Sequence, residues 1–196
     1  MTLRRGFKTE ANWYARQFRL ELGVPLHGPL CPWRLADHLC VPVYKLSEFA
    51  KRNPQAAYFL TSEGLWEFSG ATFISGRRRL IVINDGHSPK RQASDLSHEL
   101  SHCILGHAPS LPSSITGPRQ YDRTQEEEAN YLGPALLISE EAALTIARRA
   151  ITKAEASDEY SVTEDVIQMR LNLTGAFKRV VPKAPFIRNP QTRRAS

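Results

Sequence analysis

Residues Asp95 to Gly106 decide the fold, because the pentapeptide His98-Glu99-Leu100-Ser101-His102 lies inside a stretch that is predicted to be helical. A spacing of four residues puts His98 and His102 one turn apart on the same face of a helix. Two imidazoles placed in this way can bind one Zn²⁺, and Glu99 beside them can take a proton from a bound water. The alternative interpretation is an amphipathic helix with two surface histidines.

The sequence upstream favours the metal-binding interpretation. The run Leu80-Ile81-Val82-Ile83-Asn84 is short and apolar and stands between arginines and Asp85-Gly86, which indicates a buried strand. A strand, a loop and then a histidine-bearing helix is how zinc peptidases place substrate beside the metal. The same strand could pair with an extended substrate, as edge strands do.

A catalytic zinc usually has three protein ligands, and the residues directly after the pentapeptide do not supply the third. His107 follows His102 by five residues, about 140° further round a helix, so it is expected to point away from the metal. Together with Gly106 it is expected to end the helix. Cys103 follows a ligand directly and is also turned away, so it is not expected to bind zinc.

The third ligand is predicted in the next helix, over Gln125 to Leu137. The inward face of that helix holds small and apolar residues, and Glu126 shares this face. Its neighbours Glu127 and Glu128 are expected to be solvated acids in the first turn, where the helix dipole favours them. The predicted site is Glu99 as general base, with His98, His102 and Glu126 as metal ligands.

Several pieces of the chain, in order, carry a resemblance to a known family; they are Arg5 to Ala11, Cys31 to Ala36, Val41 to Val43, Ile81 to Asn84, His98 to His107 and Glu126 to Leu137. The chain resembles the ImmA/IrrE metallo-endopeptidases of bacteria and their mobile elements. This resemblance implies an α+β, zincin-like fold, with a small sheet packed on the active-site helix and further helices toward the C-terminus. It also implies that Glu126, which begins a Glu-x-x-Ala-Asn stretch, is the third zinc ligand.

The resemblance implies a zinc-dependent endopeptidase that cleaves a protein, in some members a helix-turn-helix transcriptional repressor. Asn130 stands where many relatives have Asp, and its amide would leave a zinc-bound histidine less basic than a carboxylate would. Ser139 stands where relatives often have Pro, which affects only a helix end. Tyr121 and His87 are the candidates for stabilising the oxyanion. Two other functions stay open: a metal-binding regulator that binds a repressor without cleaving it, and a zinc hydrolase of a non-peptide substrate.

The length of 196 residues predicts a single zinc metallopeptidase domain over residues 5–181, followed by a disordered basic tail over 182–196. A hydrophobic N-terminal segment and a long apolar run are both lacking, so we expect a cytoplasmic protein without a membrane span. The net charge of +6 suggests an acidic partner only weakly, and no recognition-helix pattern supports direct nucleic-acid binding. Cys31, Cys40 and Cys103 are expected to be reduced, mostly buried thiols.

Periodicity predicts helices over residues 9–22, 32–40, 94–106, 125–137, 139–153 and 161–177. It predicts strands over residues 41–44, 57–60, 65–68, 71–74 and 80–83. Pro109 to Gly117, rich in Pro, Ser and Gly, is expected to be a mobile loop between the two ligand-bearing helices.

Overall fold

The computed structural model describes residues 3–75, 78–107 and 122–180. Its sheet has three strands in the order β1-β3-β2, namely β1 (Val43–Lys45), β2 (Gly70–Ser75) and β3 (Arg78–Ile83). The helices in the described ranges are α1 (Phe7–Glu21), α2 (Pro32–His38), α3 (Leu46–Ala50), α4 (Pro54–Tyr58), α5 (Pro89–Ile104), α7 (Arg123–Leu137), α8 (Glu140–Arg149), α9 (Lys153–Tyr160), α10 (Glu164–Thr174) and α11 (Ala176–Val180). The α+β, zincin-like class is confirmed.

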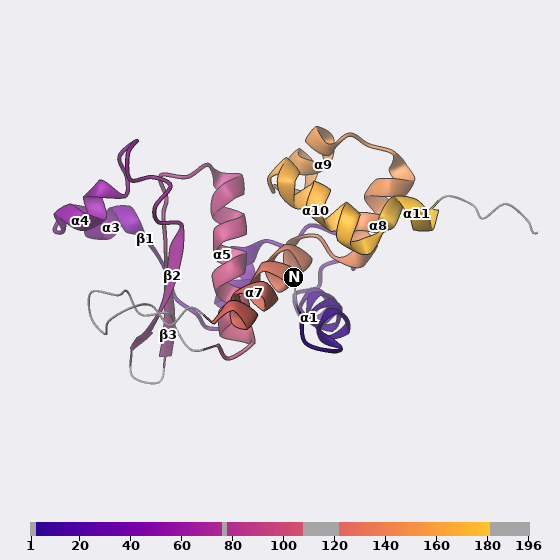
Figure 1. Ribbon diagram of the computed structural model, residues 1–196, viewed down its shortest axis with the longest axis horizontal. Helices are drawn as coiled ribbons and strands as arrows, with labels where there is room; N and C mark the ends of the chain where they lie inside the picture. Colours follow the sequence, from indigo (N-terminus) through magenta and orange to yellow (C-terminus); the bar gives the residue numbers. More distant parts are fainter. Residues whose placement is uncertain (1–2, 76–77, 108–121, 181–196) are drawn as a thin grey trace, which may run out of the picture.

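The two longest central helices separate the sheet from the C-terminal helices (Figure 1). The sheet, α3 and α4 lie on one side of α5 and α7, and α8 to α11 lie on the other. One hydrophobic core joins α1, α2, β3, α5 and α7, and a second core lies among α8 to α11. The helix α5 belongs to the first core, whereas α7 takes part in both, the second through Leu137.

The central strand β3 has the buried character that its apolar sequence predicts. It pairs in parallel with β1 and antiparallel with β2, so Ile81 lies opposite both Val43 and Thr72. Ile81 and Ile83 are buried in the main core. Because β3 is paired along both sides, the expectation that it binds an extended substrate at a free edge is wrong. The edge positions belong to β1 and β2.

Two predicted strands, over residues 57–60 and 65–68, are not strands. The Asn53 side chain accepts from the backbone N–H groups of Gln55 and Ala56, and Pro54 occupies the first helical position. This local capping begins α4 where apolar residues alone had suggested a strand. The chain then turns, and a Cβ at Gly64 would lie only 2.4 Å from the carbonyl oxygen of Tyr58, so the turn requires glycine.

Capping side chains also explain why other helices differ from their predicted bounds. Ser88 caps α5 and Pro89 occupies its first position, so this helix begins five residues before the predicted start at Ser94. The predicted helix over 139–153 ends at Ala150 in the left-handed region, and a capping box at Thr152 begins α9 instead. Gly175, also left-handed, divides the predicted helix over 161–177 into α10 and α11.

Two buried arginines hold the C-terminal end of α7. Arg19 donates to the carbonyl oxygen of Leu137 at 3.0 Å, and Arg170 donates to that of Ile138 at 2.8 Å. Both side chains are fully buried, and burial lowers the pKa of Arg19 to about 10. The last carbonyl groups of a helix lack intrahelical partners and carry its negative dipole, so these guanidinium groups stabilise the end of α7.

Other sequence expectations have mixed outcomes. Cys31 and Cys40 are exposed and Cys103 is partly buried, so the thiols are free as expected but not mostly buried. Pro109 to Gly117 and residues 182–196 lie outside the described residues. Within the described residues no helix is long and apolar enough to cross a membrane.

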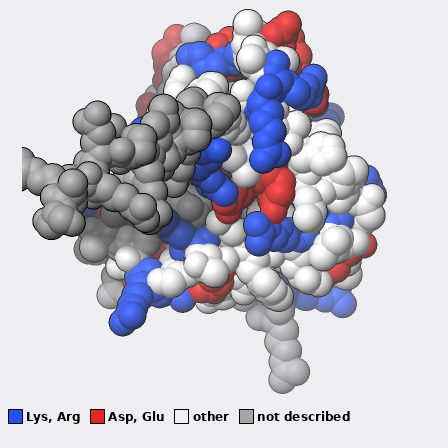
Figure 2. Space-filling view, turned by 90° about the vertical axis from the view of Figure 1, so that its right-hand side faces the viewer, with Lys and Arg blue, Asp and Glu red and all other residues white. Residues whose placement is uncertain are grey.

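The surface charge does not gather into one basic patch on the face at the right-hand end of Figure 1. Figure 2 shows Lys and Arg side chains there beside Asp and Glu side chains. In the same C-terminal region Arg149 pairs with Glu159, and Arg16 pairs with Glu141. This face therefore adds no support for nucleic-acid binding.

Candidate metal centre

The candidate site depends on the close packing of α7 against α5. A Cβ at Gly133 would lie 3.2 Å from both the Cα and the backbone nitrogen of His98, closer than most real Cβ contacts. The Ser97 hydroxyl donates to the carbonyl oxygen of Gly133 at 2.9 Å, which ties the two helices at the same level. A glycine at this position therefore lets α7 bring its own side chains up to the backbone that carries His98.

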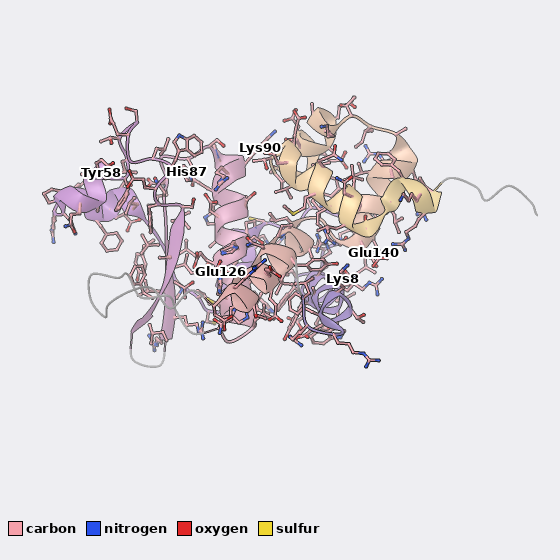
Figure 3. All side chains as sticks on the ribbon, viewed as in Figure 1. Lys8, Tyr58, His87, Lys90, Glu126 and Glu140 are labelled. Carbon is pink, nitrogen blue, oxygen red and sulfur yellow. The ribbon has the colours of Figure 1, made fainter. Side chains whose placement is uncertain are left out.

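His98, His102 and Glu126 converge on one point between the two helices. Their potential ligand atoms all lie within 4.8 Å of one another. The Nε2 atoms of the two histidines are 3.1 Å apart, and the Glu126 carboxylate oxygens lie 3.4 Å from His98 Nε2 and 3.6 Å from His102 Nε2. Figure 3 shows Glu126 on α7 where this helix crosses α5.

The donor set fits a zinc ion. Two imidazole nitrogens and one carboxylate are a ligand combination that catalytic zinc sites use, and they leave a fourth position for water or substrate. The three side chains are between 12 and 26 % exposed, so the site can be reached from solvent. Within the described residues this is the one group of three or more metal-binding side chains.

Each of the three side chains shifts the pKa of its neighbours in the group. Burial alone would lower the pKa of His98, but the hydrogen bond with Glu126 and the nearby carboxylates raise it overall. The pKa of His102 falls to about 4 because it is buried and faces the positive charge of His98. The hydrogen bond from His98 lowers the pKa of Glu126. The Glu126 carboxylate and the two imidazole rings thus face one small space, and their negative charge and nitrogen lone pairs would stabilise a cation bound there.

Glu99 lies beside this group and points toward the sheet. Burial raises its pKa, while the Thr72 hydroxyl donates to its Oε2 at 2.6 Å and opposes that rise. Thr72 lies on the edge strand β2, so this hydrogen bond connects the candidate base to the edge of the sheet. A carboxyl group with a raised pKa is suited to accept a proton and return it near neutral pH.

The sequence analysis did not identify Thr72 as a site residue. In the structure it is a buried polar residue of β2 between two partly buried neighbours, and a polar residue on the buried face of a strand is the one feature that could have pointed to it.

The two proposed oxyanion donors have different outcomes. His87 is buried, with Nδ1 at 2.9 Å from the Asp95 carboxylate and Nε2 at 2.8 Å from the carbonyl oxygen of Leu65. It lies near the start of α5, well away from Glu126 (Figure 3). Both ring nitrogens have partners, so the suggestion that His87 stabilises an oxyanion is wrong. Tyr121 lies outside the described residues.

Glu128 differs most from the sequence prediction. The Glu128 side chain is 7 % exposed and contacts both Arg4 and His107, so it is not a solvated acid. Glu127 is also largely covered, at 14 % exposed, and pairs with Arg123. His107 lies at the helix end and outside the metal-binding group, as expected, and its ring contacts that of His102.

The helix end explains the position of His107. The backbone N–H of His107 bonds to the carbonyl oxygen of His102, that of Gly106 bonds to Cys103, and Gly106 has a φ of +69°. These bonds form a Schellman motif, which reverses the chain over the last helical turn. His107 therefore lies outside the metal-binding group, as the angular argument predicted, although its contact with His102 was not predicted.

Asn130 and Cys103 lie near the site but outside the converging group, as was expected for Cys103. Asn130 is exposed, and the nearest described partner of His102 Nδ1 is His107, at 3.0 Å. The expected effect of an amide in place of Asp on a metal-bound histidine therefore has no support at this position. Cys103 is not part of the converging group; its sulfur lies 4.0 Å from the Thr72 hydroxyl.

Comparison with known families identifies the family of the chain and agrees with its fold. The sequence profile of a peptidase family described as the IrrE N-terminal-like domain matches residues 56–172, more than half of the chain. The chain belongs to this family. The IrrE N-terminal-like region begins within α4 and extends into α10, so it contains β2, β3, α5 and α7. No curated protein matches the chain.

Membership confirms the resemblance drawn from the sequence pieces. It also makes the protein a member of a peptidase family, and the His-His-Glu group of the IrrE N-terminal-like domain is a possible metal site.

Proposed function

We propose that this protein is a zinc-dependent endopeptidase that hydrolyses a peptide bond in a protein substrate. The observation that supports this most strongly is the convergence of His98, His102 and Glu126, with Glu99 next to them on the same helix. A purely structural zinc site has no need of a buried carboxylate that is close to the metal but outside the ligand set. Membership in a peptidase family supports the same reaction.

The proposed mechanism divides the work among few residues. The two histidines and Glu126 would hold the zinc, which when bound would act as a Lewis acid toward water and the scissile carbonyl. Glu99 takes the proton of the attacking water and then delivers it to the leaving nitrogen. Thr72 holds the carboxylate of Glu99 through its hydroxyl, so the base stays oriented while it gains and loses the proton.

An extended substrate would bind along β2. This strand is an edge of the sheet, it packs against α5, and Thr72 on it contacts Glu99. Backbone hydrogen bonds to an edge strand hold a peptide in extended form and leave its side chains free to be recognised. A peptide held there passes beside the base, which suits an endopeptidase better than a hydrolase of small molecules.

The decisive experiment combines metal analysis with cleavage. The protein should purify with about one zinc per chain, and it should cleave a helix-turn-helix repressor encoded beside its gene in a zinc-dependent manner. Glu99→Gln is the matched control, because the amide keeps the shape, should keep the zinc, and cannot accept the proton. A Glu99→Gln variant that cleaves as fast as the parent would show that Glu99 is not the base.

The other outcomes separate the rival functions. Zinc binding and repressor binding without cleavage, in both parent and variant, would identify a metal-binding regulator. Zinc-dependent activity on a small ester or amide, without activity on any protein, would identify a hydrolase of non-peptide substrates. A folded protein that takes up no zinc would overturn the proposal altogether.

A further inference from the structure

A line of polar side chains runs from the N-terminal segment to the candidate metal ligand His102. Arg4 Nε donates to Glu128 Oε1 at 2.7 Å, and the other Glu128 oxygen lies 3.4 Å from His107 Nε2. His107 Nδ1 then lies 3.0 Å from His102 Nδ1. His102 Nε2 is the atom that faces Glu126 and the metal position.

The proton positions along this line follow from the chemistry of each group. If Nε2 of His102 binds a metal, its ring proton must be on Nδ1, which can then donate to Nδ1 of His107. A neutral His107 that accepts at Nδ1 carries its own proton on Nε2, which points at the Glu128 carboxylate. Each contact along the line thus has one hydrogen-bond donor and one acceptor, and no two protons face each other.

The buried Glu128 carboxylate has one partner for each oxygen, Arg4 for Oε1 and His107 for Oε2. Burying a carboxylate is costly unless it is paired and hydrogen-bonded. Arg4 supplies one partner, but its side chain is 49 % exposed, and a solvated arginine could pair with a solvated carboxylate equally well. The Glu128 side chain is instead 7 % exposed and lies against an equally buried His107. This buried position keeps one carboxylate oxygen of Glu128 against Nε2 of His107.

We propose that Glu128 acts through His107 as the carboxylate that orients and polarises His102. Histidine ligands of zinc commonly donate their second ring N–H to a carboxylate, a carbonyl group or water, which fixes the tautomer and makes the ligand more basic. Here an imidazole lies between ligand and carboxylate, and the Schellman motif at Gly106 places it there. Glu128 and His107 are positioning residues, and this inference rests on the proposed zinc site.

The first test measures zinc affinity by competition with a chromophoric chelator in the full-length protein. His107→Phe keeps a ring in the space but removes both polar links, and zinc affinity should fall by about 10- to 100-fold. His107→Gln can still accept from His102 and donate to Glu128, so it should recover most of the loss. Glu127→Gln, one residue from Glu128 on the same helix, is the charge-matched control and should bind zinc like the parent.

A double-mutant cycle tests whether Glu128 acts through His107. Glu128→Gln alone should weaken zinc binding by about tenfold. In the His107→Phe background the same change should have an effect within about twofold of none, because the connection is already broken. Independent losses that multiply in the double variant would overturn the proposal. If His107→Phe does not fold, parent-like zinc affinity in Glu128→Gln overturns it equally.

A spectroscopic readout separates positioning from mere packing. In the zinc-loaded parent, long-range ¹H–¹⁵N spectra of the histidine rings should show His102 protonated at Nδ1 and His107 protonated at Nε2. The opposite tautomer at His107 would overturn the proposed line. A parent that binds no zinc would instead refute the proposed function, while a parent that binds zinc with unaffected His107 and Glu128 variants would refute this inference alone.

Discussion

Replacing Gly133 by Ala tests how the helix packing controls the metal centre. The new methyl carbon would lie 3.2 Å from the Cα and the backbone nitrogen of His98 and 3.3 Å from the carbonyl carbon of Ser97. These are backbone atoms of a packed helix and cannot rotate away, so α5 and α7 must move apart by a few tenths of an ångström. Overpacking of this kind costs about 1–3 kcal/mol.

Two effects oppose each other in this variant. Alanine is favoured over glycine inside a helix by about 1 kcal/mol, so the net loss of unfolding free energy should be about 0–2 kcal/mol. Zinc binding has no such compensation, because Glu126 moves with α7 while His98 and His102 stay on α5. A functional site has to be held to within about 0.5 Å of its productive geometry, and a shift of a few tenths of an ångström uses up much of that margin. Zinc affinity should therefore fall by up to about tenfold.

Urea unfolding with excess chelator measures the packing effect, and chelator competition measures the zinc effect. Ser97→Ala is a useful comparison, because it removes one hydrogen bond to Gly133 without changing the helix spacing, and should cost about 1 kcal/mol with little change in zinc affinity. The reasoning is refuted if Gly133→Ala is more stable than the parent by the full helix-propensity gain and binds zinc equally well.

Three further predictions concern the site. Glu126→Ala should lose most zinc affinity, because two histidines alone bind zinc poorly, whereas Glu127→Ala should keep it; the reverse result in chelator competition would reassign the third ligand. Thr72→Val should keep its zinc but lower kcat about tenfold, because the hydroxyl that holds the candidate base is gone; an unchanged kcat would exclude that role. Because the pKa of His98 lies above its ordinary 6.5 while that of His102 falls to about 4 and that of Glu126 is also lowered, one proton should compete with zinc between the pKa values of the two histidines. Calorimetry should show affinity falling about tenfold per pH unit within that range, and a pH-independent affinity would contradict the charge assignment.

The features of the site that follow from helix periodicity were predictable from the sequence. The spacing of His98 and His102, and the shared face of Glu126 with small residues, depend only on helix geometry, and the structure brings these side chains together. The central strand was predictable for the same reason, because a short apolar run with turn residues after it admits few other structures. These arguments use local periodicity and need no knowledge of the neighbouring elements.

The features that depend on chain reversals or on distant partners were not predictable. Glu128 was assigned to solvent because charged residues in a first helical turn usually lie there, and its partner Arg4 is 124 residues away. The contact of His107 with His102 was not predicted, because the left-handed Gly106 changes the direction of the chain just before it. Strand propensity failed near residues 57–60, where the Asn53 cap and Pro54 outweigh the apolar pattern.

The buried arginines at the end of α7 limit how the protein could be shortened. Arg170 comes from α10, and its guanidinium reaches a carbonyl group at the far end of the helix that carries Glu126. A fragment that stopped after α7 would lose this donor and expose the apolar surface that α8 and α10 cover. Lysine would be a poor replacement for the second arginine, Arg19, because a single ammonium lacks the planar fork with which Arg19 donates to the carbonyl groups of Gly28, Ala15 and Leu137. The C-terminal helices are thus a structural requirement of the part that carries the candidate site, and an engineered minimal version of the protein would have to retain them.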